Sequence, residues 1–298
     1  MTPALASRRA TLPMLAAAFV SGAAVLAAVF PVAVSIGAVF VFAGPHNWLE
    51  ARYFVARLPV RWGRQRGFFL LALSGVAALS LTFSLVPVDR SIWHIALVAW
   101  AICLTRLSHR EALPLLVPVT LAWAALACLF PNYADLALVY LHPLAALWFV
   151  RRQIAKSLPQ WLPQFRILAM ALPIMALFVV TARAGEVAPG AAQVTSFVPL
   201  ASSTALVALH AFLELLHYGA WVLLLPAIGL ATRPWNIRTI PLVRRWPKLV
   251  AAVLALGAMI VLLLWVLFAF DYQTTRGIYF SVAIVHVLVE VPFLIWLR

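Results

Sequence analysis

Three histidines of this sequence are each followed, four residues later, by a glutamate. A random order of the same residues would give roughly 0.1 such pairs, so the spacing is a strong signal. An offset of four returns a side chain to the same face of an α-helix, so the members of each pair lie together in a helical segment. The pairs are His46/Glu50, His210/Glu214 and His286/Glu290.

The apolar stretch from residue 201 to residue 231 carries the densest group of such side chains. Offsets of four and seven place His210, Glu214 and His217 on one stripe of a helix. An ionisable side chain inside a membrane-spanning segment is costly, and by default it marks a functional site. Three of them on one stripe indicate a shared ligand, most simply a metal ion.

The chemistry of the donor atoms favours iron. Imidazole binds iron, zinc, copper and nickel, and a mixed set of imidazole and carboxylate ligands with open positions is typical of redox iron. A glutamate beside each histidine is either a direct ligand or the acceptor that orients the imidazole. We therefore expect a mononuclear or dinuclear iron centre, with zinc or a b-type haem as alternatives. The candidate ligands are His46, Glu50, His142, His210, Glu214, His217, His286 and Glu290.

The expected depths of these candidates in a bilayer agree with a single site. His142, His210 and His286 each fall about eight or nine residues from the outer end of an apolar segment. Glu214 and His217 lie about one to two turns closer to the cytoplasmic side. A lone intramembrane histidine also serves as a hydrogen-bond donor between helices, and for His142 that alternative stays open.

The other titratable residues are expected to be ordinary. His94 and His109 lie at segment ends or in a basic loop, which predicts that they are solvated. Cys103 and Cys128 lie in apolar segments without metal-ligand spacing, which indicates packing rather than a disulfide. The remaining carboxylates are expected in loops: Asp89, Glu111, Asp135, Glu186 and Asp271.

The composition indicates an integral membrane protein. Of the 298 residues 65% are apolar and 10% are charged, and the mean hydropathy is +1.03. Soluble domains carry about 25% charged residues. Successive apolar runs suit membrane-spanning helices, and no polar stretch is long enough to form a soluble domain. We predict an all-α polytopic helical bundle of about nine transmembrane helices, forming one transmembrane domain over residues 1–298.

Positive charge is concentrated in short connectors between the apolar runs. Basic connectors at 51–66, 106–110, 151–166 and 232–248 alternate with connectors that are poor in positive charge. The positive-inside rule then accounts for the net charge of +14 without a nucleic-acid partner. It predicts that these connectors and the C-terminus face the cytoplasm of a bacterial-type inner membrane. The predicted spans are residues 12–43, 67–87, 91–107, 112–130, 133–150, 167–183, 202–230, 249–269 and 277–297.

The first apolar run, residues 12–43, is interrupted by Pro31 and precedes a basic, aromatic connector at 44–66. Roughly 30 residues is short for two full crossings at about 1.5 Å per residue. One long kinked or tilted helix therefore fits the length better than a hairpin at Pro31, and the sequence leaves both open. A single span would leave Arg8 and Arg9 on the outer side, against the alternation of charge.

Several classes of function fit these features. We favour a membrane oxidase or oxygenase whose iron activates O2 beside a lipid-soluble substrate, such as a fatty acyl chain, a carotenoid or a quinone. Its partners would be membrane lipid and, where electrons are needed, a separate electron donor. The alternatives are an intramembrane zinc hydrolase, although the H-E-x-x-H pattern is absent, and a proton or metal-ion transporter, although no internal repeat is evident. A b-type haem protein would leave the paired glutamates unexplained.

Overall fold

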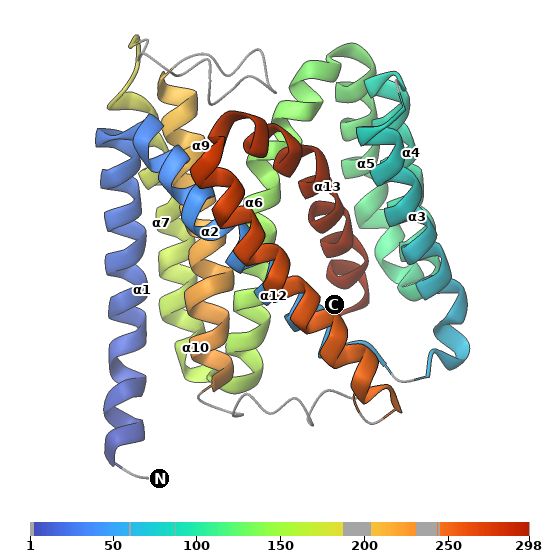
Figure 1. Ribbon diagram of the computed structural model, residues 1–298, viewed down its shortest axis with the longest axis horizontal. Coiled ribbons are helices and arrows are strands. Elements are labelled where there is room, and N and C mark those ends of the chain that lie inside the picture. The colour runs from blue at the N-terminus through green and yellow to red at the C-terminus, as the bar shows by residue number, and fades with distance from the viewer. Residues whose placement is uncertain are drawn as a thin grey trace. The chain divides into compact units, whose positions relative to one another are not determined.

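The computed structural model describes residues 3–59, 61–86, 88–186, 204–230, 243 and 245–297. All of the regular elements in these ranges are helical (Figure 1). Nine of the described helices are long and apolar enough to cross a membrane, by their length and composition. The predicted fold class, an all-α bundle with many spans, is confirmed. The chain divides into two compact units, which are described in turn.

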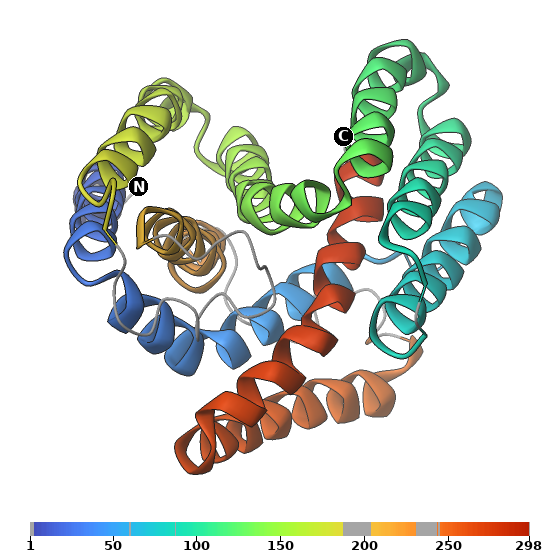
Figure 2. The same cartoon turned by 90° about the horizontal axis from the view of Figure 1, so that it is seen from above.

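The first unit comprises Met1–His46 and Tyr140–Trp235. Its central helix, α9 (Thr204–Tyr218), continues through a π-helix (Gly219–Leu224) into α10 (Leu225–Leu230). Around it pack α1 (Pro3–Val29), α7 (Leu162–Thr181), the first part of α2 (Pro31–Val55) and most of α6 (Pro131–Ser157) (Figure 2). Of the residues in the α9–α10 span 67% are buried, compared with 6% of the residues in the span that contains α7. The helix that carries His210, Glu214 and His217 is thus the most enclosed of the nine spans.

The second unit comprises Asn47–Val139 and Asn236–Arg298. Its core helix, α13 (Tyr272–Trp296), packs against α3 (Arg66–Ser84), α4 (Arg90–Ser108) and α12 (Pro247–Phe270), and α4 also packs against α5 (Leu113–Leu129). Large apolar side chains such as Phe68, Trp93 and Leu288 fill the interior. Asp89 and Asp271 cap the N-termini of α4 and α13 by accepting backbone N–H groups, so these two carboxylates lie in loops as predicted.

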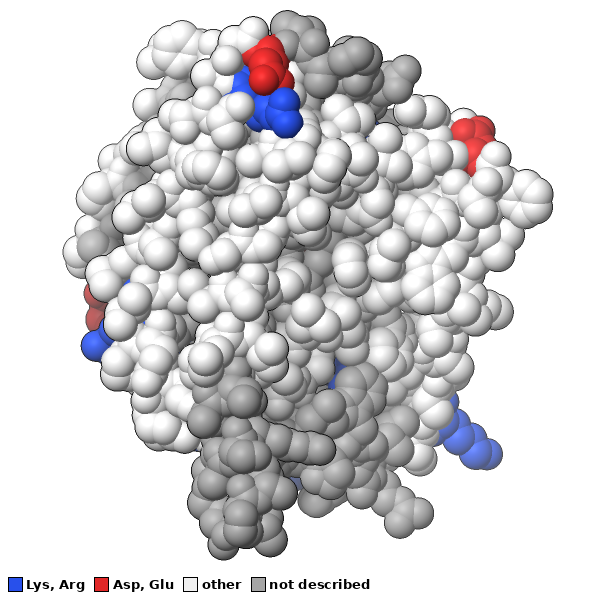
Figure 3. Space-filling view, turned by 90° about the vertical axis from the view of Figure 1, so that its left-hand side faces the viewer, with Lys and Arg blue, Asp and Glu red and all other residues white. Residues whose placement is uncertain are grey.

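The outer surface is apolar, as contact with lipid requires. Long helices such as α12 expose leucine, valine and methionine side chains along most of their length. Figure 3 views the face that contains α1, and charged side chains lie toward its margins with a broad uncharged band between them. Cys103 and Cys128 are free, exposed thiols, in agreement with the prediction that they form no disulfide.

The first apolar run differs from its prediction. The expected single helix over residues 12–43 is wrong, because α1 ends at Val29 and a second helix, α2, begins at Pro31. Proline lacks the N–H that a helix interior needs but suits a first helical position, so the chain breaks at Phe30 and restarts. Figure 1 shows α1 and the start of α2 running in different directions from this break. Helix α2 then continues to Val55, so half of the predicted connector 44–66 is helical.

Candidate metal centre

Helix α2 presents His46 and Glu50 one turn apart, and both side chains are buried, at 1% exposure. The Nδ1–H of His46 donates a hydrogen bond of 2.9 Å to the backbone carbonyl of Phe42. Because a carbonyl oxygen only accepts, this bond places the proton on Nδ1 and leaves a lone pair on Nε2. Metal-binding histidines are oriented in the same way, through a backbone carbonyl or a carboxylate. His46 therefore has the tautomer of a metal ligand.

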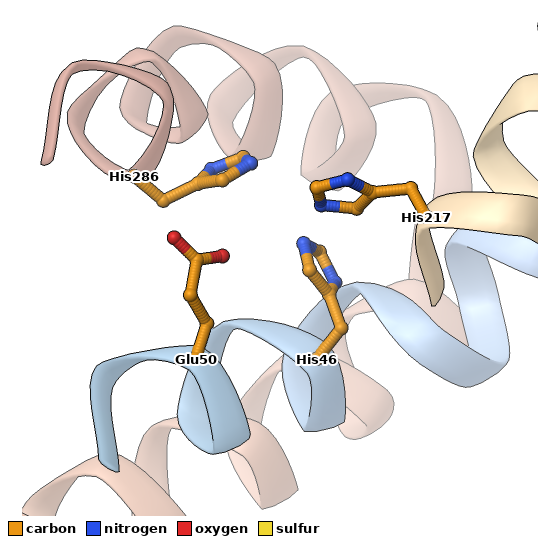
Figure 4. A group of neighbouring side chains, drawn as sticks. All are labelled: His46, Glu50, His217 and His286. Carbon is orange, nitrogen blue, oxygen red and sulfur yellow. The ribbon is translucent and has the colours of Figure 1, made fainter. Parts of the chain in front are cut away.

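Within the first unit, His46 meets two further histidines. A ligand nitrogen of His46 lies within 4.8 Å of one of His217, from α9, and the two rings point toward one another (Figure 4). The centroids of these rings are 5.2 Å apart. The ring of His142, from α6, lies 4.6 Å from that of His217. Tyr218 packs its ring 4.6 Å from His46 on another side. Three helices thus bring three imidazoles together.

Within the second unit, Glu50 meets residues of α13. A carboxylate oxygen of Glu50 lies within 4.8 Å of a ring nitrogen of His286, beside which it is drawn in Figure 4. Glu290, one turn further along α13 and 1% exposed, interacts electrostatically with Glu50. Oε2 of Glu50 is buried and accepts no hydrogen bond from any described residue. A buried carboxylate oxygen in this state suits a bound cation.

These contacts form a His/Glu cluster around one turn of α2. His46 and Glu50 follow one another by one turn on a single helix, and the donor atoms of His46, Glu50, His217 and His286 lie within 4.8 Å of one another. Imidazole nitrogen and carboxylate oxygen are the donors that iron and zinc share. The set offers enough ligands for one metal ion and further groups close by.

The pair His210 and Glu214 lies apart from this cluster and has partners of its own. Nδ1 of His210 is 3.5 Å from Oε2 of Glu214, and the hydroxyl of Ser35 donates to the same oxygen over 3.5 Å. The ring of Tyr140 packs 5.6 Å from that of His210. The stripe predicted on α9 is present and buried. Of its three residues, His217 belongs to the cluster on α2, and His210 and Glu214 do not.

The segment that follows His217 was not predicted from the sequence. Residues Gly219–Leu224 form a π-helix, a distortion that is common at functional sites. At Gly219 a Cβ atom would lie 2.3 Å from the ring of Phe19 on α1, so glycine permits close approach of the two helices. The sequence signal that could have indicated this contact is Gly219 itself, because a glycine inside an apolar helical pattern often marks close packing of two helices.

The prediction that His94 is solvated is wrong. Its side chain is fully buried on α4, where the indole N–H of Trp123 donates to Nδ1 over 3.3 Å. Nε2 therefore carries the proton and donates to Asp135 over 2.9 Å. The sequence places His94 near the start of an apolar segment, but α5 and α6 cover that end of α4. His109 behaves as predicted, since it is partly exposed and pairs with the exposed Glu111.

Comparison with known proteins finds no protein-family model, no curated protein and no solved structure that matches this chain.

Proposed function

We propose that this chain is a membrane-embedded, iron-dependent oxidoreductase that acts on a lipid-soluble substrate. One observation carries the proposal: the donor atoms of the buried His46, Glu50 and His217 and of the partly buried His286 lie within 4.8 Å of one another. His46, Glu50, His217 and His286 would bind the metal ion. His142 and Glu290 lie next to members of this set and would orient them or take part as ligands.

The donor set supports iron as the metal. Two histidines and one carboxylate with open positions are typical of non-haem iron oxygenases, and the present set would contain that arrangement with one further imidazole. When bound, iron would supply electron transfer to O2. The carboxylates are compatible with a cation at this place, because two glutamates close together in an apolar interior must be neutralised by a proton or by a bound cation.

The protein contributes orientation and exclusion of water. The carbonyl of Phe42 holds the ring of His46 with Nε2 turned away from its own helix backbone. Tyr218 and the buried Trp221 pack beside His217, with ring centroids 6.0 Å and 6.5 Å from it. These aromatic walls keep the surroundings apolar, which suits a site where reactive oxygen species must not meet water.

The two helices on either side of Pro31 also support the membrane orientation proposed from the sequence. Because α1 and α2 are separate helices, each long enough to cross, Arg8 and Arg9 fall on the same side as the basic connector that follows α2. With α5, whose apolar part is shorter, counted as a tenth crossing beside the nine long helices, the positive-inside rule applies to every connector and both ends of the chain lie in the cytoplasm. Protease accessibility of tags at each terminus in inverted and right-side-out vesicles tests this orientation.

Metal analysis of the purified protein, with its optical and electron paramagnetic resonance spectra, tests the function. We expect about one iron per chain, and its loss in both His217→Ala and Glu50→Ala, because each substitution removes a ligand. His109→Ala is the matched control, since His109 lies in an exposed loop pair, and it should keep the metal. Zinc without iron would reject the oxidoreductase and indicate a hydrolase. A Soret band would indicate a haem protein instead. A protein without bound metal would indicate a transporter.

A further inference from the structure

The first unit contains an apolar cavity of about 460 Å³ that is separate from the histidine cluster. Four segments line it: residues 12–21 of α1, 147–154 of α6, 161–175 leading into and along α7, and 216–228 of α9 to α10. Its floor includes Val20, Val150 and Leu216, which are all buried. The volume lies in the range of about 300–1,000 Å³ that is usual for sites of one small molecule.

Part of the lining of this cavity comes from a basic segment of the chain. The connector at residues 151–166 carries Arg151, Arg152, Lys156 and Arg166 and has no acidic residue. Trp161 and the polar Gln164 of the same connector line the cavity, so its apolar lining and the basic connector are continuous. Each arginine or lysine near a membrane surface attracts an anionic head group by about 1 kcal/mol. The site is thus complementary to an apolar chain with an anionic end.

The surroundings favour entry from lipid. Exposed lining residues such as Met14 and Ile167 lie on the surfaces of α1 and α7. Charged side chains lie toward the margins of the face that contains α1 (Figure 3). The modest volume suits a single chain better than the two chains of a phospholipid.

We propose that this cavity binds a long-chain fatty acid, with its chain along α1, α7 and α9 and its carboxylate at the basic connector. Leu216 of the lining immediately precedes His217, so the chain lies along the helix that carries a proposed metal ligand.

Photolabelling with a diazirine analogue of palmitate tests the binding site directly. Labelled peptides, identified by mass spectrometry, should come from α1 and α7. Ala17→Trp fills the cavity and should reduce labelling by at least about tenfold. Ala18→Trp is the matched control, because Ala18 is exposed like Ala17 but lies outside the lining, and it should label normally. Equal labelling of the two variants would show ordinary surface lipid and overturn the proposal.

Selectivity for the anionic head tests the basic end. The methyl ester of the same probe should label about fivefold less well, and Arg166→Gln should abolish this difference. Arg106→Gln, in a different basic connector, should preserve it. Equal labelling by acid and ester in the wild-type protein would overturn the assignment of a fatty acid.

Iron content measured in the same samples separates the two proposals. Labelling of the cavity in a protein that binds no iron supports the fatty-acid site and rejects the proposed function. An iron-containing protein whose cavity is not labelled rejects the fatty-acid site alone. Ala17→Trp should retain its iron, since Ala17 lies in α1, which supplies none of the proposed ligands.

Discussion

Gly219 lies against the ring of Phe19. Replacing Gly219 with alanine should therefore lower the free energy of unfolding of the wild-type protein, but raise it in a protein that lacks this ring. In Gly219→Ala the new methyl group would lie 2.3 Å and 2.4 Å from two carbons of the Phe19 ring, so α1 or α9 must shift. Overpacking of this kind costs about 1–3 kcal/mol. Alanine in a helix otherwise gains about 0.5–1 kcal/mol over glycine. The free energy of unfolding should therefore fall, by about 1 kcal/mol.

Removing the ring should reverse the effect. In a Phe19→Ala background the clash is absent, so Gly219→Ala should raise the free energy of unfolding by about 0.5–1 kcal/mol. The coupling energy from the double-mutant cycle should then be about 1–3 kcal/mol. Gly22→Ala is the matched control within α1, because nothing lies within 4 Å of its new Cβ atom, and it should stabilise the protein.

Equilibrium unfolding in mixed micelles, followed by helical circular dichroism, measures all four proteins and the control. A stable Gly219→Ala protein with no coupling to Phe19 would refute the close approach of α1 and α9. Gly219 follows His217 by two residues, so the same cycle also reports on the packing of the helix next to this proposed ligand.

Three further outcomes are expected. Replacing His94 with alanine should lower the free energy of unfolding by about 1–3 kcal/mol, because Trp123 and a carboxylate lose their buried partner, while metal content stays unchanged. The pKa of Asp271 lies below its ordinary value of 3.8, because its carboxylate accepts hydrogen bonds from Thr274. The ionised carboxylate therefore stabilises the folded protein above about pH 4, and this contribution is lost at lower pH. Unfolding of Asp271→Asn followed from pH 6 down to pH 2 should lack that contribution. Metal analysis of Glu214→Gln should find wild-type iron, because Glu214 pairs within its own polar group; loss of iron there would restore a single site on the α9 stripe.

The sequence was sufficient to predict a helical membrane protein and the residue types of the candidate site. Apolar runs identify spans directly, and the spacing of four identifies His46 and Glu50 as neighbours because it depends only on local helix geometry. The grouping of helices in space could not be predicted in this way. His210 resembles His217 in spacing, yet it faces Ser35 and Tyr140, and the difference depends on which helix packs against each side of α9.

Errors in the prediction arose where local pattern and packing disagree. The position of His94 at the end of a segment suggested contact with water, but neighbouring helices bury it. The hydropathy of residues 12–43 suggested one long helix, because the polar residues on both sides were assigned to connectors. Those residues extend the two helices to 27 and 25 residues, enough for both to cross.

The turn of α2 between His46 and Glu50 has a consequence for local unfolding. These two side chains lie one turn apart on a single helix, and both are buried. A metal ion that binds both would stabilise this turn by about 2.7 kcal/mol at a hundredfold excess over the dissociation constant, because it binds the folded turn alone. The backbone amides of the turn should then exchange with deuterium about a hundredfold more slowly in the loaded protein, and chelation should remove this protection.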